Sequence, residues 1–295
     1  MSPEHSATPG GVPPDGVRTP GGVPPDGVPP DGVRTVAAVP SDRSVTRLVL
    51  VRHGEARCNV TGICGGRRGC TGLTERGVAQ VVALRDRLLA SGELAGADAL
   101  VASELPRAIE TAELLAPALV LPGRAGPPEV VRHCGVCELH PGAADGLGWA
   151  EFSERFGDPD WDVEPDRPIA PGGESWTGFV RRVEVTLRSL AAAHAGELVV
   201  VACHAGVVEA SLLALLPVAG GQDGARLQLR TAHASLTTWE VDGGRWRLLA
   251  YNDAAHLVGA RGTPAPAPDP APDPAPDPAP EPAPAPAPRA AAQQA

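Results

Sequence analysis

Apolar residues along this chain fall into two patterns, short runs and longer stretches with helical spacing. The short runs have the length of strands and lie at Leu48–Val51, Ala97–Ser103, Pro128–His133 and Leu198–Ala202. Helical spacing predicts helices at 75–92, from Pro106 onward, at Trp149–Phe156, at Trp176–His194 and at Val207–Leu216. Thr74 is expected to cap the first helix. A hairpin is predicted from two further strands, near Ser235–Val241 and Trp246–Tyr251.

Strands alternate with helices along most of this stretch, and this order favours a largely parallel sheet. We therefore predict an α/β fold of three layers, α/β/α, in which a mostly parallel sheet lies between helices. Ligands of such sheets bind beyond the carboxyl ends of the strands. Residues that directly follow the strands are thus the first candidates for a functional site.

The two ends of the chain have a different composition from the middle. Pro9–Thr35 repeats a pattern of Gly, Val, Pro and Asp, and Thr263–Pro288 repeats Pro, Ala and Asp. Neither end supplies enough large apolar residues to offset the ordering entropy of a folded core. We predict disordered tails at 1–44 and 262–295 around one globular domain at 45–261. The C-terminal tail suits polyproline II, as a spacer, as a ligand for a domain that binds proline-rich motifs, or as a solvated tail.

Charge and cysteine content restrict the classes of partner and compartment. The formal net charge of −10 argues against a general nucleic-acid-binding surface. All positive charge comes from arginine, because the chain contains no lysine. No secretory signal and no apolar run of membrane-spanning length are found, so a cytoplasmic location without membrane contact is expected. Six cysteines in that compartment are expected to be reduced thiols.

Chemistry-bearing residues follow several of the predicted strands. Arg52 and His53 come directly after the first strand, and His204 closely follows Leu198–Ala202. Arg107 lies at the start of the helix after the second strand. Two guanidinium groups and two imidazoles at one edge of a sheet suit the binding of a phosphoryl group. A small-molecule phosphomonoester is therefore the expected substrate.

The same residues could support a reaction at phosphorus. His53 could attack phosphorus and form a phosphohistidine, while Arg52, Arg107, His204 and Asn59 stabilise the phosphoryl oxygens. Glu138 is the plausible carboxylic acid for protonating the leaving group, with His140 as an alternative. No metal or cofactor is expected, because the arginines can neutralise the phosphoryl charge.

Five motifs in order resemble the histidine phosphatase superfamily, which has the phosphoglycerate-mutase-like fold. They are R-H-G-E at 52–55, L-T-E-R-G at 73–77, S-E-L-P-R-A-I-E-T-A at 103–112, P-G-G-E-S at 171–175 and H-A-G at 204–206. The end of the domain, Y-N-D-A-A-H-L at 251–257, is also similar. The resemblance covers essentially all of 47–257 and implies the expected fold.

The resemblance also implies a role for each matching residue. His53 would be the phosphorylated nucleophile, and Arg52, Arg107 and His204 would complete the phosphate pocket. Asn59 would contact substrate, and Glu138 would be the proton donor of the phosphatase members. The chain departs from the family at Ala56, where Ser or Thr is common, and at Cys70, where Asp is frequent. A phosphatase is favoured over a phosphoglycerate mutase-type phosphotransferase, because the long basic insertion of the mutases is absent.

Other interpretations of the same residues stay open at this point. Cys70 to Arg76 fits the C-x5-R pattern of cysteine phosphatases. Cys134 and Cys137 have the C-x2-C spacing of a zinc site, and His133 and His140 beside them are further candidate ligands. Arg107 could simply pair with Glu110 one turn along its helix. A non-catalytic phosphate-binding scaffold with proline-rich arms is a further alternative.

Overall fold

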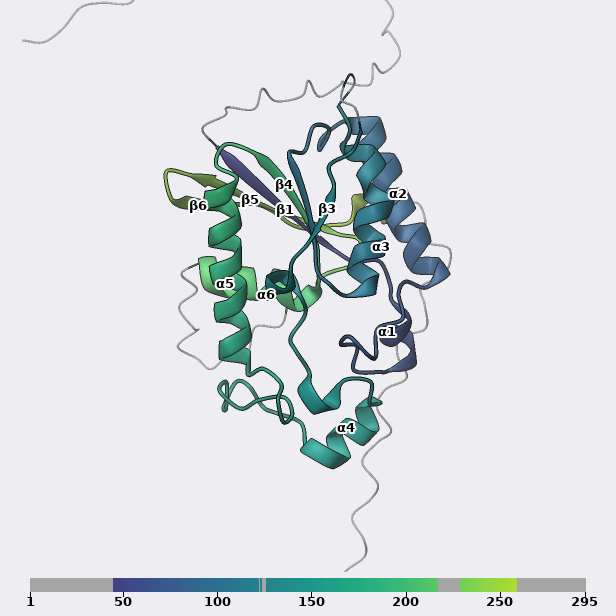
Figure 1. Cartoon of the computed structure of the whole chain (residues 1–295), viewed down its shortest axis with the longest axis vertical. Helices are drawn as coiled ribbons and strands as arrows, with labels where there is room; N and C mark the ends of the chain where they lie inside the picture. The colour runs from purple at the N-terminus through teal and green to yellow at the C-terminus, as the bar shows by residue number, and fades with distance from the viewer. Residues whose placement is uncertain (1–44, 122, 124–125, 217–228, 259–295) are drawn as a thin grey trace, which may run out of the picture. The chain divides into compact units, whose positions relative to one another are not determined.

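The computed structural model describes residues 45–121, 123, 126–216 and 229–258. The tails predicted at 1–44 and 262–295 lie outside the described residues, so the domain boundaries and the role of the C-terminal tail stay predictions. Within the described part of the chain, a six-stranded sheet lies between two groups of helices (Figure 1). None of the helices described there has the length and apolar character needed to cross a bilayer.

The strands of the sheet are ordered β3-β2-β4-β1-β5-β6. Their bounds are β1 Thr46–Arg52, β2 Ala99–Ala102, β3 Val130–Arg132, β4 Leu198–Cys203, β5 Leu236–Asp242 and β6 Arg245–Asp253. The first four in sheet order are parallel, and β5 runs antiparallel to β1 with Val51 opposite Leu236. The carboxyl ends of four strands and the start of β5 therefore meet at one edge of the sheet.

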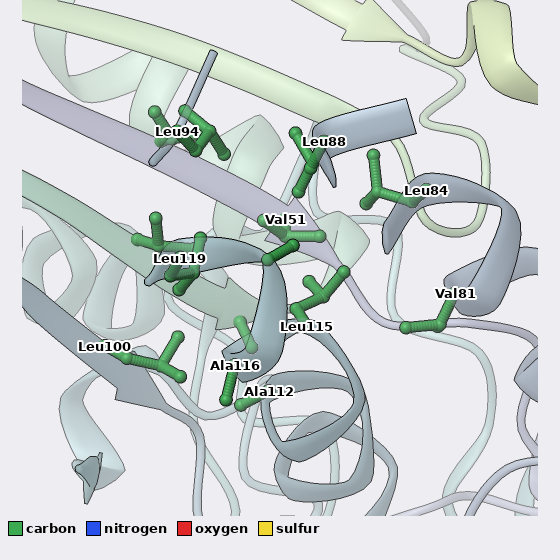
Figure 2. Close-up of a cluster of buried hydrophobic side chains, with 14 of the residues drawn as sticks. Val51, Val81, Leu84, Leu88, Leu94, Leu100, Ala112, Leu115, Ala116 and Leu119 are labelled. Atoms are coloured by element: carbon green, nitrogen blue, oxygen red, sulfur yellow. The ribbon is translucent and has the colours of Figure 1, made fainter. Parts of the chain in front are cut away.

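One face of the sheet is covered by α2 (Glu75–Ser91), α3 (Pro106–Leu115) and η1 (Ala116–Leu119). Helix α2 begins as predicted, because the Thr74 hydroxyl accepts a hydrogen bond from the backbone of Gly77. Figure 2 shows the apolar layer beneath these helices, where Leu84 and Leu88 of α2 and Leu115 of α3 surround Val51. Its side chains are largely withdrawn from water, so this layer fixes α3 against the sheet.

The opposite face is covered by α5 (Trp176–Ala193) and α6 (Ala205–Leu215). Phe179, Val183 and Leu187 form the predicted apolar face of α5 and are fully buried. Trp239 of β5 is also fully buried in this layer. The two layers together confirm the predicted α/β/α arrangement, with the hairpin β5–β6 as its antiparallel part.

Short elements differ from the prediction more than long ones. Helix α4 is found at Trp149–Phe156 as expected, whereas α1, at Arg57–Thr61, was not predicted. Helix α1 has five residues and no side-chain hydrogen bond from its N-cap residue Ala56, so it lacks the usual signal of a helix start. The 3₁₀ helices η2 (Cys134–Val136), η3 (Gly142–Ala144) and η4 (Ala255–Leu257) were also missed.

Two glycines bring the start of α2 against the segment that follows β1. A Cβ added at Gly54 would overlap the carbonyl of Gly77, and one added at Gly77 would overlap the backbone of Glu55. Thr74 is held to the same segment through a bond from its backbone N–H to the Glu55 carbonyl, 2.9 Å away. Gly54 therefore allows two backbone segments to pack closely, and this contact anchors the residue beside it, His53.

Candidate active site

The side chains of His53, Arg107 and His204 meet at the carboxyl edge of the sheet. Nε of Arg107 lies 3.1 Å from Nε2 of His53 and 3.3 Å from Nδ1 of His204. The two imidazole rings have centroids 5.1 Å apart, and all three side chains are buried. The structure thus brings together three predicted site residues that are up to 151 positions apart in the sequence, from His53 to His204.

Hydrogen bonds determine where the proton of His53 lies. Nδ1 of His53 is 2.6 Å from the carbonyl oxygen of Gly54, so Nδ1 carries the proton and donates it to that oxygen. Nε2 is then unprotonated and accepts from Arg107. Burial first, and then the Arg107 guanidinium, hold the pKa of His53 well below its usual value. His53 therefore presents a neutral ring whose free lone pair is on Nε2.

His204 is held in the opposite tautomer. Its Nε2 lies 2.7 Å from the hydroxyl of Ser103, and its Nδ1 accepts from Arg107. The hydroxyl of Ser103 also accepts from the backbone N–H of Leu105 and donates to Sγ of Cys137, 3.3 Å away. These bonds assign the proton of His204 to Nε2. Burial, followed by Arg107, also holds the pKa of His204 well below the usual value, so the ring is neutral.

Arg107 projects from the first turn of α3, directly after Pro106. Its Nη1 donates to the carbonyl oxygen of Gly65 at 2.7 Å. Glu110, the alternative partner, instead accepts a bond from the backbone N–H of Leu73 at 2.8 Å. Arg107 is therefore directed at the histidines and the glycine-rich loop, and it contacts no carboxylate through any hydrogen bond or ion pair of the described residues.

Arg52 approaches the same cluster from the end of β1. Its Nη2 lies 2.8 Å from Nε2 of His233, and its Nη1 donates to the backbone carbonyl of Thr231. Nε of Arg52 is buried and has no hydrogen-bond partner among the described residues. Burial lowers the pKa of Arg52, while the nearby Glu138 carboxylate acts in the opposite direction. An anion that accepted from this unpaired N–H would relieve its desolvation.

Glu138 reaches the site from the loop between β3 and α4. One carboxylate oxygen accepts from the backbone N–H of Gly206 at 3.2 Å and the other from its neighbour Leu139 at 3.1 Å. A Cβ at Gly206 would overlap this carboxylate, so a side chain there would displace it. Glu138 is therefore held at the N-terminus of α6, in the turn that follows His204.

Comparison with known proteins identifies the family of this site. A family model described as the histidine phosphatase superfamily (branch 1) matches residues 48–254. The chain belongs to this superfamily. The predicted family and its assignment to phosphatase-type enzymes are therefore confirmed, and so is the fold class.

Proteins similar to this chain include several that are named as phosphatases. The metal-independent phosphoserine phosphatase of Arabidopsis thaliana is 30% identical over 221 residues, which are 73% of this chain and 85% of that protein. A bifunctional protein of Mycobacterium tuberculosis is 35% identical over 202 residues, 67% of this chain, but the match spans only 51% of its length. A solved mycobacterial glucosyl-3-phosphoglycerate phosphatase, complexed with VO3, has a TM-score of 0.55 at 27% identity and covers 70% of this chain and 98% of its own.

Two motifs shared with the superfamily have clear structural roles here. Glu174 of P-G-G-E-S forms a bidentate pair with Arg182, with both N–O distances at 2.7 Å, and accepts from the backbone N–H of His140. Arg182 also donates to the carbonyls of Cys134, Gly135 and Cys137 at 3.0–3.1 Å. The pair therefore fixes the loop that presents Glu138.

Asn252 of the closing motif holds another segment of the site. It lies in β6 with a positive φ of 55°. Its Oδ1 accepts from the backbone N–H of Ala232 at 2.6 Å, and its Nδ2 donates to the carbonyl of Arg230 at 3.0 Å. These bonds hold the segment just before β5, which carries His233.

Ser103 and His233 were missed as site residues by sequence reasoning. The His233 ring lies 5.8 Å from that of His53 between centroids, and burial lowers the pKa of His233 to about 3. Ser103 directly follows β2. It could have been found by the strand-end rule, which takes residues that directly follow strands as site candidates and which located the other residues. His233 precedes β5, and only the antiparallel direction of β5 brings it to this edge.

Asn59 stands apart from the other predicted site residues. Its exposed side chain accepts from the backbone N–H of Ala56 at 3.1 Å and thus closes the first turn of α1. No described hydrogen bond joins it to His53, Arg107 or His204. The predicted contact between Asn59 and substrate therefore stays a prediction.

The C-x5-R alternative does not form a phosphate cradle. Arg76 is exposed and pairs with Glu55 at 3.4 Å, and Thr74 caps helix α2. Cys70 is buried, and a hydrogen bond from Cys58 lowers its pKa. The loop from Cys70 to Arg76 thus directs its polar groups to the start of the helix rather than to a common anion site.

Proposed function

We propose that the protein hydrolyses the phosphomonoester of a small metabolite in two steps, through a phosphohistidine at His53. The observation that carries this proposal is the state of the His53 ring, which is neutral and has its only N–H bonded to the Gly54 carbonyl. The remaining lone pair, on Nε2, lies beside the guanidinium of Arg107. A nucleophile and a group that stabilises phosphoryl oxygens are therefore adjacent.

In the first step Nε2 of His53 attacks phosphorus, and the bond from phosphorus to the ester oxygen breaks. The hydrogen bond that Nε–H of Arg107 donates to the histidines is then donated to a phosphoryl oxygen instead. The unpaired Nε–H of Arg52 supplies another donor. His204 donates from Nδ1 only as an imidazolium, since its other N–H is bonded to Ser103. The charge of a bound phosphoryl group favours that form.

Protonated Glu138 gives its proton to the departing alkoxide. In the second step the resulting carboxylate takes a proton from water, which attacks phosphorus and breaks its bond to Nε2. Orthophosphate is released, and His53 returns to its neutral form. The position of Glu138 at the start of α6, next to His204, supports this role.

A cavity of about 340 Å³ beside Glu138 supports a small leaving group. Arg67, His140 and Asp145 contribute polar groups to its lining. His53, Arg107 and His204 do not line the cavity. Glu138 therefore links this cavity to the cluster of His53, Arg107 and His204 that is proposed to bind the phosphoryl group. The relatives named for phosphoserine and glucosyl-3-phosphoglycerate give the first substrates to test. Six free thiols support a reducing compartment, and we therefore propose the cytoplasm as the location.

The test is hydrolysis of p-nitrophenyl phosphate by the full chain and by His53→Ala. We expect His53→Ala to lose turnover on the order of 10⁴-fold or more. Rapid quenching of the native protein should trap an acid-labile, base-stable phosphate that is absent from His53→Ala. His194→Ala is the matched control, because His194 pairs with Glu197 at the end of α5, outside the cluster.

Activity that survives in His53→Ala would overturn the proposal, as would trapped phosphate on a cysteine. Release of free orthophosphate, rather than transfer to a second phosphorylated metabolite, distinguishes a hydrolase from a mutase. Binding of substrate by the native protein without any turnover would instead support a phosphate-binding scaffold.

A further inference from the structure

Three of the side chains first considered as zinc ligands gather in one place. The ligand atoms of Cys134, Cys137 and His140 all lie within 4.8 Å of one another. Sγ of Cys134 is 3.3 Å from Nε2 of His140, close to the separation of about 3.6 Å expected between sulfur and nitrogen around tetrahedral zinc. His133 is not part of this group, because it caps η2 by accepting from the backbone N–H of Gly135.

The loop that carries the three side chains is fixed by other contacts. Arg182 donates to the carbonyls of Cys134 and Cys137, and Glu174 accepts from the backbone of His140. All of these bonds use backbone atoms of the loop. Of the side chains, Cys137 accepts from Ser103, and Nδ1 of His140 lies 3.4 Å from a Glu174 carboxylate oxygen, so Nε2 of His140 is the nitrogen that faces Sγ of Cys134. The three ligand atoms are therefore brought together by the fold, before any ion is present.

The donor set is that of a soft or borderline divalent cation. Two thiolates and one imidazole are typical zinc ligands, and three protein ligands leave a fourth position open. All three residues line the cavity beside Glu138, which gives an ion access.

We propose that Cys134, Cys137 and His140 form a three-ligand Zn²⁺ site whose open position faces this cavity, and that the bound ion inhibits the enzyme. Binding releases the thiol protons of both cysteines and forms two sulfur–zinc bonds and one nitrogen–zinc bond. The geometric assignment of the site does not depend on the proposed function, whereas the inhibition rests on it.

Inhibition follows because the zinc site adjoins Glu138 on one side and the support of His204 on the other. Glu138 is the residue next to Cys137 and lines the same cavity, so a cation bound there attracts its carboxylate away from the position that it takes at the backbone N–H of Gly206. Sγ of Cys137 also accepts a hydrogen bond from the hydroxyl of Ser103, and the oxygen of that hydroxyl accepts one from the N–H of His204. Coordination of this sulfur therefore alters the support of His204 as well.

The binding experiment uses Co²⁺ as a spectroscopic probe for the full-length protein. We expect one Co²⁺ per chain with a thiolate-to-cobalt charge-transfer absorption, which Zn²⁺ displaces. Cys134→Ser and His140→Ala should each weaken Co²⁺ binding by about 10-fold or more, with unchanged circular dichroism. His133→Ala is the matched control and should bind Co²⁺ as the native protein does.

Absence of the thiolate absorption in the native protein would overturn the site. Equal Co²⁺ affinity in Cys134→Ser and the native protein would overturn it as well. A loss of binding in His133→Ala comparable to that in His140→Ala would contradict the three-ligand assignment.

The activity experiment tests inhibition separately. Buffered Zn²⁺ should suppress hydrolysis of p-nitrophenyl phosphate by the native protein, EDTA should restore it, and His140→Ala should require about 10-fold more Zn²⁺ or higher. Full activity of the native protein with the site filled would refute the inhibition but leave the site. A native protein without any phosphatase activity would refute the proposed function, and the cobalt spectrum would still decide the site.

Discussion

Ser103 is the residue on which the proton arrangement of the site depends. Its hydroxyl oxygen accepts from Nε2 of His204 and from the backbone of Leu105, while its hydrogen is directed to Cys137. With Nε2 protonated, the other nitrogen of His204 faces Arg107. Ser103 is therefore a positioning residue, acting through His204 rather than on the substrate.

Removal of the Ser103 hydroxyl should allow the proton of His204 to leave Nε2 for the other ring nitrogen, Nδ1. We expect Ser103→Ala to lower kcat/KM about 10- to 100-fold, since a buried N–H is left without an acceptor, at a cost of about 1–3 kcal/mol. The ¹⁵N shifts of His204 should report a changed tautomer. Ser211→Ala is the matched control, because Ser211 is equally buried but bonds Trp239 in the apolar layer. Unchanged ¹⁵N shifts in Ser103→Ala would contradict the assigned role.

At the scale of single residues, the strand-end rule located much of the cluster from sequence. It predicted Arg52, His53 and His204 because each closely follows a strongly apolar run. It failed for His233, because no local sequence pattern indicates that β5 runs antiparallel to β1 and therefore begins at this edge of the sheet. Pairings between distant segments decide such positions, and local sequence patterns do not contain them.

The segment that carries Glu138 lies between the 3₁₀ helices η2 and η3, and one ion pair fixes it. Glu174 and Arg182 are joined by two bonds of 2.7 Å, and their side chains are only 20% and 19% exposed. Sequence reasoning identified Glu174 as part of a motif but gave it no role, because its partner lies eight positions along in helix α5. Long elements were predicted well, since their apolar periodicity is set by the core, whereas α1 and the 3₁₀ helices depend on local contacts.

Loss of this ion pair should affect both stability and turnover. We expect Glu174→Gln to reduce the free energy of unfolding by about 1–3 kcal/mol, because Arg182 loses a charged acceptor. The turnover number should also fall, because the Glu138 loop is less well fixed. Urea unfolding and steady-state kinetics measure the two effects. Glu184→Gln, in an exposed pair with Arg188 on the same helix, should change stability by no more than about 0.5 kcal/mol.

At the scale of the whole molecule, buried histidines link folding to pH. Burial is the first cause that lowers the pKa of His53, His204 and His233 in the folded protein. The unfolded chain binds protons on these rings near pH 6.5, while the folded chain does not until the pH is much lower. Their contribution to stability is therefore complete above pH 6.5 and is lost as the pH falls below it.

The free energy of unfolding should consequently decrease between pH 7.5 and pH 5. The slope should approach about 1.4 kcal/mol per pH unit for each proton that only the unfolded chain binds. Urea titrations at several pH values measure it, and His233→Gln should give a smaller slope than the native protein. A stability that is constant down to pH 5 would contradict neutral burial of these rings.

The unpaired Nε–H of Arg52 has one more consequence. Two guanidinium groups are assembled in the interior before any phosphate ester arrives, and their mutual repulsion is already included in the free energy of the native state. Part of the energy needed to organise the reaction is thus supplied during folding. Orthophosphate, the product, fits the same donors, so its departure competes with the attraction that brought the substrate in.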